Sequence, residues 1–118
     1  MNNIEDFRIY CLSMKGVTEK FPFDETTLVF SVMNKMFCLV DISSFEYCNL
    51  KCDPDEAEEL RAMYMGVKPG YHMNKKHWNS VYFNSDISPK LLEELVVKSY
   101  GLVVKGLKKS DKELLASL

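Results

Sequence analysis

The chain has 118 residues, which is enough for one domain with one hydrophobic core and too few for two ordinary domains. Its apolar share of 47% and charged share of 27% are typical of soluble globular proteins, and no apolar run approaches the roughly 18 residues of a membrane-spanning helix. The net charge of −2 argues against a generic polyanion-binding protein. We therefore expect a single domain over residues 1–118 and no membrane partner.

The N-terminus and the cysteines indicate a cytoplasmic, reducing location. The first six residues have neither the cationic lead nor the apolar segment of a secretory signal. The four cysteines form no Cys-x-x-Cys pair, and their spacing to His72 and His77 matches no zinc pattern. They are Cys11, Cys38, Cys48 and Cys52. We expect them to be small buried apolar residues, and we expect no metal and no cofactor.

Apolar residues at helical spacing predict an amphipathic helix over residues 4–15, with Asn3 placed to cap it and Gly16 to end it. The next apolar segment, residues 19–23, can form only an edge strand, because Pro22 cannot donate to a β-ladder.

An alternating segment over residues 27–32 and an apolar run over 36–42 predict a β-hairpin connected by residues 33–35. Asn34 is the residue of this connection that best tolerates a left-handed conformation. The second strand is apolar on both faces, which favours a central place in the sheet. Residues 47–52 alternate again and extend an antiparallel meander.

A second helix is predicted over residues 54–64, because Asp53 can accept from its first free amides and Pro54 suits its first position. Its expected buried face consists of Ala57, Leu60, Met63 and Tyr64. Arg61 is explained as well by an ion pair with Glu58 on the same helix as by a ligand contact.

The remaining elements are a long loop over residues 66–79, a strand over 80–84, and a helix over 89–105 that starts after Ser88. Residues 111–118 are expected to add only a short, frayed helical turn. Together these elements predict an α+β fold, in which about five antiparallel strands, mostly a meander, carry three packed helices.

The loop over residues 66–79 holds the only tryptophan, both histidines and three lysines, and it has no acidic residue. The candidates for contact with nucleic acid are Lys68, Asn74, Lys75, Lys76, His77 and Asn79. The candidates for anchoring the loop or for stacking on a ligand are Tyr71, His72 and Trp78. Charge is also uneven along the chain, since residues 1–65 carry six basic and twelve acidic residues and residues 66–110 carry eight and three. The fold decides whether this asymmetry makes one cationic patch or is intermixed.

Several motifs between residues 5 and 109 are distinctive. They are Arg8-x-Tyr10-Cys11-Leu12, Gly16-Val17-Thr18-Glu19, Phe21-Pro22-Phe23-Asp24, Asn49-Leu50-Lys51-Cys52-Asp53-Pro54, the block from Pro69 to Trp78, and Ser99-Tyr100-x-Leu102-Val103. Together they resemble the MmcQ/YjbR family of small bacterial proteins. The resemblance implies helices packed on an antiparallel sheet, with a shape related to bacterial frataxin-like proteins. It also implies DNA binding through a double-wing motif, in which sheet hairpins lie against the duplex.

These observations support three hypotheses about function. The first is a non-enzymatic DNA-binding protein, monomeric, that contacts duplex phosphates through the loop. The second is an adaptor for a protein or a small ligand, with a pocket around Tyr71, His72 and Trp78. The third is a weak metal-binding or enzymatic role, for which we identify no catalytic residue. The nearest candidate for an iron-binding ridge is the acidic cluster Asp53, Asp55, Glu56, Glu58 and Glu59, which is also typical of a solvated helix face.

Overall fold

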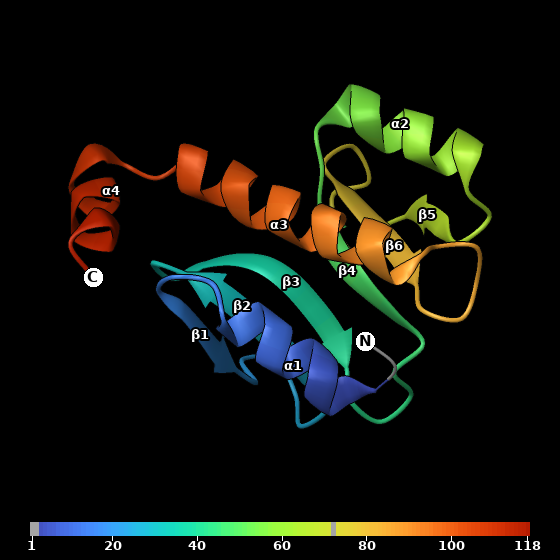
Figure 1. Cartoon of the computed structure of the whole chain (residues 1–118), viewed down its shortest axis with the longest axis horizontal. Coiled ribbons are helices and arrows are strands. Elements are labelled where there is room, and N and C mark those ends of the chain that lie inside the picture. Colours follow the sequence, from blue (N-terminus) through green and yellow to red (C-terminus); the bar gives the residue numbers. More distant parts are fainter. Residues whose placement is uncertain (1–2, 72) are drawn as a thin grey trace.

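The computed structural model describes residues 3–71 and 73–118 (Figure 1). Within these residues, one antiparallel sheet has the strand order β1-β2-β3-β4-β6-β5. The strands are β1 (Val17–Lys20), β2 (Thr27–Val32), β3 (Lys35–Asp41), β4 (Tyr47–Lys51), β5 (Val67–Pro69) and β6 (Trp78–Tyr82). The helices are α1 (Ile4–Leu12), α2 (Pro54–Met63), α3 (Pro89–Lys105) and α4 (Lys109–Ala116). The predicted α+β class is confirmed.

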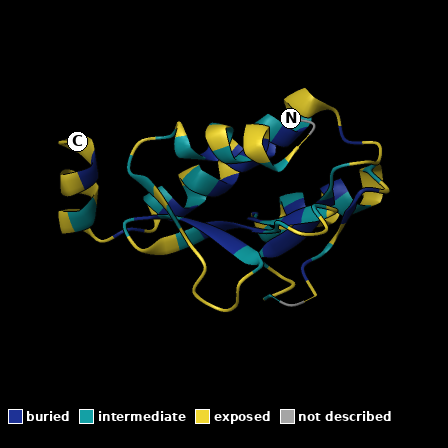
Figure 2. Ribbon diagram, turned by 90° about the horizontal axis from the view of Figure 1, so that it is seen from below, coloured by how far each residue is buried: buried dark blue, intermediate teal, exposed yellow. Residues whose placement is uncertain are grey.

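The two faces of the sheet are treated differently. Helices α1, α2 and α3 lie on one side, while loops 21–26 and 70–77 project on the opposite side (Figure 2). The main hydrophobic core fills the space between the sheet and these helices, with Phe7, Phe30 and Phe37 fully buried. Helix α4 lies beyond one end of the sheet (Figure 1). We call the side without helices the uncovered face.

The predicted helix starts are confirmed by their capping contacts. The Asn3 side chain accepts from the Asp6 amide at 2.8 Å, and the Ser88 hydroxyl accepts from the Leu91 amide at 3.0 Å. The Asp53 carboxylate accepts from the amides of Asp55 and Glu56. Each contact satisfies an amide that the first helical turn leaves without a partner.

The β2–β3 hairpin turns through Met33 and Asn34, which have φ values of 48° and 65°. Two successive left-handed residues give the turn that matches the twist of a two-residue hairpin, as expected for Asn34. Strand β3 lies between β2 and β4, so its predicted central place is also confirmed. This placement explains why β3 is apolar on both faces.

Several predicted boundaries were wrong. Helix α1 ends at Leu12 rather than at residue 15, and Gly16 lies just before β1 with a φ of 75°. The positive φ favours glycine at this position, and a Cβ there would also lie 2.5 Å from Leu115 Cδ1 of α4, which would have to shift. Strand β1 covers Val17–Lys20 and ends before Pro22, as the missing donor of proline requires.

The predicted numbers of strands and helices were each one too low. Strand β5 forms inside the segment assigned to the long loop, because Val67 is buried and pairs opposite Val81. Strand β6 begins at Trp78, two residues earlier than predicted. Helix α4 is a helix of eight residues rather than a frayed turn, and Leu115 is its buried contact. On α2, Met63 is 69% exposed, so its assignment to the buried face of the helix was wrong.

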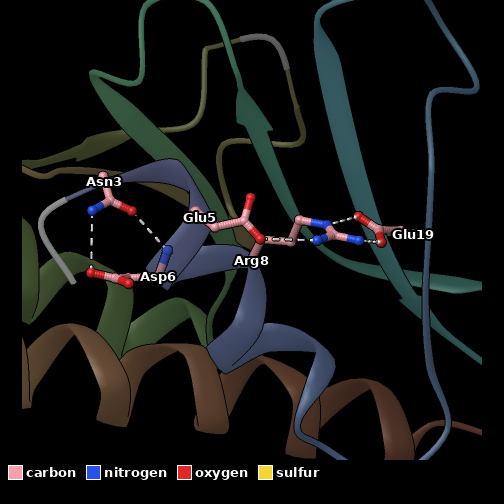
Figure 3. Close-up of polar contacts among 5 residues, drawn as sticks. All are labelled: Asn3, Glu5, Asp6, Arg8 and Glu19. Atoms are coloured by element: carbon pink, nitrogen blue, oxygen red, sulfur yellow. Dashed lines mark hydrogen bonds and ion pairs between the residues drawn. The ribbon is translucent and has the colours of Figure 1, made fainter.

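A bidentate ion pair joins α1 to β1 (Figure 3). The Arg8 guanidinium donates to the two Glu19 carboxylate oxygens at 2.7 and 2.5 Å, and it also contacts Glu5 at 3.1 Å. The hydrogen bonds from Arg8 lower the pKa of the Glu19 carboxyl. The pair fixes α1 over the edge strand, next to the core side chain of Phe7.

Ser99 joins α3 to the sheet where β3 and β4 diverge. Its hydroxyl donates to the Phe37 carbonyl at 2.6 Å and accepts from the Lys51 amide at 2.8 Å. Both backbone groups lie beyond the paired part of these strands, which spans Cys38 to Val40 on β3. One fully buried hydroxyl therefore satisfies two backbone groups that the ladder leaves over.

The four cysteines are free and buried, as predicted. Cys11, Cys38 and Cys48 belong to the core between the sheet and the helices, and burial raises the pKa of the Cys38 thiol well above its ordinary value. None of the helices in the described part of the chain has the length and apolar content that crossing a bilayer requires.

Candidate nucleic-acid interface

A small apolar cluster fills the centre of the uncovered face. Val29 of β2, Leu39 of β3 and Trp78 of β6 are buried there, and Met73 packs against them from loop 70–77. These side chains alternate with those that face the helices, so they lie on one side of the sheet. Trp78, which is only 8% exposed, is therefore an anchor rather than a stacking surface.

Loop 70–77 is shaped by backbone hydrogen bonds. The Gly70 amide donates to the Trp78 carbonyl at 3.0 Å, and the amides of His77 and Trp78 both donate to the Asn74 carbonyl, at 3.1 and 2.9 Å. A Cβ at Gly70 would lie 3.1 Å from the Trp78 carbonyl oxygen, so the close approach favours glycine. The His77 carbonyl in turn accepts from the Cys52 amide at 2.7 Å, which fixes the end of the loop to β4.

Arg61 of α2 is the side chain that fastens this loop to the helices. Its Nε donates to Asn79 Oδ1 at 2.7 Å, and its Nη2 donates to the carbonyls of Lys75 and, at 3.4 Å, Trp78. The structure shows no ion pair with Glu58, so that explanation of Arg61 was wrong. Asn79 Nδ2 completes the connection by donating to the Ala57 carbonyl of α2 at 3.4 Å.

The predicted contact residues divide into two groups. Lys68, Asn74, Lys75 and Lys76 are exposed, and His77 is half-buried. Asn79 is 2% exposed and bound to Arg61, so its assignment as a nucleic-acid contact was wrong. The reason is the alternation of side chains along β6. Asn79 and Val81 point toward the helices, so Asn79 does not reach the uncovered face.

Tyr71 is 61% exposed and does not anchor the loop. Its ring lies 5.3 Å from Lys75 Nζ, a distance at which the ammonium is attracted to the ring face. The Asn74 side chain accepts from the Lys76 amide at 2.9 Å and so holds the turn that presents both lysines. The prediction for His72 lies outside the described residues.

The uncovered face carries aromatic side chains that we did not single out from the sequence. Tyr47 of β4 and Tyr82 of β6 are opposite one another, with ring centroids 5.0 Å apart. Phe21 and Phe23 are 47% and 63% exposed on loop 21–26, which flanks the same face. The sequence could have revealed these residues. Tyr82 lies four residues after Trp78 on β6 and therefore on the same face, and Tyr47 is its cross-strand neighbour.

Cations lie at both edges of this face and on loop 70–77, although the charge asymmetry of the sequence does not form one patch. Lys20 and Lys68 project from the edge strands β1 and β5, opposite Val29 and Ser80 of the uncovered face. Lys75 and Lys76 project from loop 70–77. The remaining basic residues of the second half lie mainly on α3 and the start of α4, away from this face, so the fold intermixes the two halves.

Two aspartates flank the uncovered face and are used locally. The Asp24 carboxylate accepts from the Thr27 and Thr26 amides at 2.6 and 2.9 Å, and these bonds lower its pKa. The Asp41 carboxylate accepts from the Ser43 hydroxyl and amide and from the Ser44 amide, which lowers its pKa as well. Both carboxylates stabilise turns and stay ionised at neutral pH.

A hollow of about 360 Å³ lies between the two loops on this face. Its walls include Phe23 from one loop and Met73 from the other, over Leu39, Tyr47 and Asn49 of the sheet. The sequence predicted a pocket around Tyr71, His72 and Trp78. In the observed hollow, the residue that loop 70–77 contributes to the wall is Met73.

The chain matches the YjbR family model over residues 12–102. The chain belongs to the YjbR family. It is 43% identical over 94 residues to the uncharacterized protein YbdF of Escherichia coli O157:H7, covering 79% of this chain and 77% of that protein. It is 28% identical to the uncharacterized protein YjbR of Escherichia coli strain K12 over 116 residues, which cover 98% of each chain.

Solved structures show the same YjbR-family fold. The crystal structure of Deinococcus radiodurans protein DR2400, with family-model domain DUF419, aligns with a TM-score of 0.89 and 40% identity. The alignment covers 98% of this chain and 89% of that one. A protein from Pseudomonas syringae aligns with a TM-score of 0.71 and 25% identity, covering 85% of this chain and 97% of that one. These bacterial relatives support the family and the fold, and their names state no activity.

Two residues of the predicted acidic cluster at α2, Asp53 and Glu56, have structural roles in this YjbR-family chain. Asp53 caps the helix, and Glu56 binds Lys98 of α3 at 2.6 Å. Across residues 3–71 and 73–118, no group of three or more His, Cys, Asp or Glu side chains is arranged to hold a metal ion.

Proposed function

We propose that this YjbR-family protein binds DNA through the uncovered face of its sheet and loop 70–77, without catalysing a reaction. The observation that carries the proposal is a sheet face that presents aromatic rings and has exposed lysines at both edges and on one loop, namely Lys20, Lys68, Lys75 and Lys76. Lysines bind phosphates, and aromatic rings bind bases or pack against sugars.

The arrangement of the two loops also supports a DNA ligand that lies between them on the uncovered face. The two loops project from the sheet on the same side, so a ligand lying between them contacts both (Figure 2). Arg61 and Asn74 fix the backbone of loop 70–77, so Lys75 and Lys76 are presented without ordering the loop on binding. Few cations are involved, so the affinity is expected to be modest and strongly salt-dependent.

The hollow between the loops favours a second candidate function, that of an adaptor for a protein or small ligand. A cavity of about 360 Å³ lined by Phe23, Met73 and Leu39 fits an apolar group, and Asn49 offers a hydrogen-bonding amide. Such a ligand would bind with little dependence on salt, which distinguishes it from DNA.

The test is fluorescence anisotropy with a labelled random duplex, and a single strand of the same length, at two salt concentrations. We expect the wild-type protein to bind the duplex, and the affinity to fall steeply as salt rises. The double variant Lys75→Ala with Lys76→Ala should weaken binding at least tenfold and flatten the salt dependence. It keeps the Lys75 carbonyl that Arg61 binds, so the loop stays in place.

The matched control is the double variant Lys108→Ala with Lys109→Ala. These lysines are exposed at the start of α4, and the Lys108 side chain makes no capping hydrogen bond. The control has the same net charge as the loop variant, so equal losses would show nonspecific electrostatics and reject this face. Negligible binding of both probes by the wild type would remove the DNA proposal.

A further inference from the structure

A second cavity, of about 300 Å³, lies on the helix-covered side of the sheet. Its lining residues place it between α2 and α3, next to the end of β4 and to β6. Its apolar lining comes from all four elements and consists of Leu50, Cys52, Leu60, Val81, Leu95 and Leu102. The volume is at the lower end of the range for small-molecule sites, and the lining is of the kind such sites have.

Gly101 lies at this cleft in the interior of α3, where glycine is unfavourable. Glycine in a helix costs about 1 kcal/mol relative to alanine. A Cβ at Gly101 would meet no atom within 4 Å, whereas a Cβ at Gly70 would lie 3.0 Å from Trp78 Cβ. Neither packing nor a left-handed φ therefore requires glycine at position 101. Its effect is to leave the space at the cleft free of a side chain.

One of the cations that line the cleft has no ion-pair partner in the part of the chain that the structure describes. Glu56 is paired with Lys98 at 2.6 Å, and the Asp53 carboxylate is occupied as the cap of α2. Lys105 also lines the cleft and is exposed, and among the described residues no carboxylate lies within ion-pair distance of it. A ligand with an apolar body and one negative group would fill the lining and meet the Lys105 ammonium.

Cys52 contributes to the lining as a neutral thiol. Burial, together with the nearby carboxylates of Glu56 and Asp53, raises its pKa to about 11. The thiol is therefore protonated at neutral pH, and its low thiolate fraction does not favour nucleophilic attack. The chemistry of the cleft is reversible binding rather than covalent capture.

We infer that the cleft between α2 and α3 binds a small organic carboxylate with an apolar chain, held by the leucine-rich lining and by Lys105. The site lies on the opposite side of the sheet from the DNA-binding face proposed above. The inference does not depend on DNA binding, and its test is separate. The ligand class follows from cavity volume, the apolar lining and the unpaired cation at the rim.

The test is a titration of the protein with octanoate, followed by amide chemical shifts in NMR spectra. Octylamine and octanol serve as the cationic and neutral probes of the same chain length. We expect saturable shifts at Leu50, Leu95 and Leu102 with about 1 mM octanoate. Octylamine should bind at least tenfold more weakly, and Lys105→Ala should weaken octanoate severalfold while leaving octanol unchanged.

Two substitutions at one position separate filling of the cleft from helix stability. Gly101→Leu places a side chain in the cleft and should weaken octanoate binding at least tenfold. Gly101→Ala adds only a Cβ into open space and should bind within a fewfold of the wild type. Both variants should melt at or above the wild-type temperature, because both residues favour the helix. Absence of saturable shifts, equal binding of octylamine, or unchanged binding by Gly101→Leu would overturn the inference.

Discussion

The two faces of the sheet differ in what stabilises them. On the helix-covered face, Phe7 of α1 is fully buried and meets Phe30, Phe45 and Phe83 edge-on, with ring centroids 6.2, 6.1 and 5.3 Å away. On the uncovered face, the hydrophobic cluster among the described residues has only three buried members, with two partly buried methionines packed against it. Stability therefore resides on the first face, and the second is left with exposed rings and cations. The uncovered face therefore contributes less to stability, which leaves its side chains available for the binding proposed above.

The largest expected effect comes from the covered face. Phe7→Ala removes a fully buried ring and should lower the free energy of unfolding by about 3–5 kcal/mol. Tyr82→Ala, on the uncovered face, removes one half-buried ring of a cross-strand pair and should cost about 1 kcal/mol or less. Urea unfolding of both variants measures the contrast, and similar losses would contradict the division of roles between the faces.

A smaller effect is expected where the faces are connected. Arg61→Met keeps much of the apolar stem but leaves the buried Asn79 amide oxygen without its donor, which should cost about 1–3 kcal/mol. Faster hydrogen exchange at the His77 and Trp78 amides should accompany this loss, because their loop is no longer held. The control is Glu58→Gln, which removes the nearby helical charge that the sequence offers as a partner for Arg61. If Glu58→Gln changed the free energy of unfolding by more than about 0.5 kcal/mol, an ion pair between Glu58 and Arg61 would be supported after all.

The smallest expected effect is the pH dependence of stability that Asp24 contributes from loop 21–26. The amides of Thr27 and Thr26 hold the pKa of Asp24 below its ordinary value of 3.8. The unfolded chain therefore takes up the proton first on acidification. The contribution of Asp24 to stability is present above pH 3.8 and is lost as the pH falls through its folded pKa.

NMR titration checks this expectation. The Thr26 and Thr27 amide shifts should titrate with a midpoint below 3.8, and the transition should vanish in Asp24→Asn. The amide shifts of the covered face, such as that of Phe37, should not follow the same transition. A midpoint at or above 3.8 would show that the carboxylate does not bind these amides in solution.

The parts of the fold that the sequence predicts well are those decided within a few residues. The caps at Asn3, Asp53 and Ser88 act over two or three positions, and the turn at Asn34 depends on its own backbone preference. These local rules needed no knowledge of the remaining structure.

The features that sequence reasoning missed depend on partners far along the chain. Strand β5 forms only because Val67 meets Val81, and its three residues carry too little pattern to be recognised alone. The contact between Arg61 and Asn79 joins residues 18 positions apart, and that between Lys98 and Glu56 spans 42. A charged side chain has several possible partners in a sequence, and tertiary packing selects among them.

The Asn79 side chain has a consequence for how the two proposed sites affect each other. It lines the cleft between α2 and α3, and Arg61 connects it to the carbonyl of Lys75 in the loop proposed to bind DNA. A carboxylate that shifts α2 therefore also shifts the position from which Lys75 meets a phosphate. By thermodynamic reciprocity, any factor by which a bound carboxylate changes the affinity of the loop for DNA equals the factor by which DNA changes the affinity of the cleft for the carboxylate.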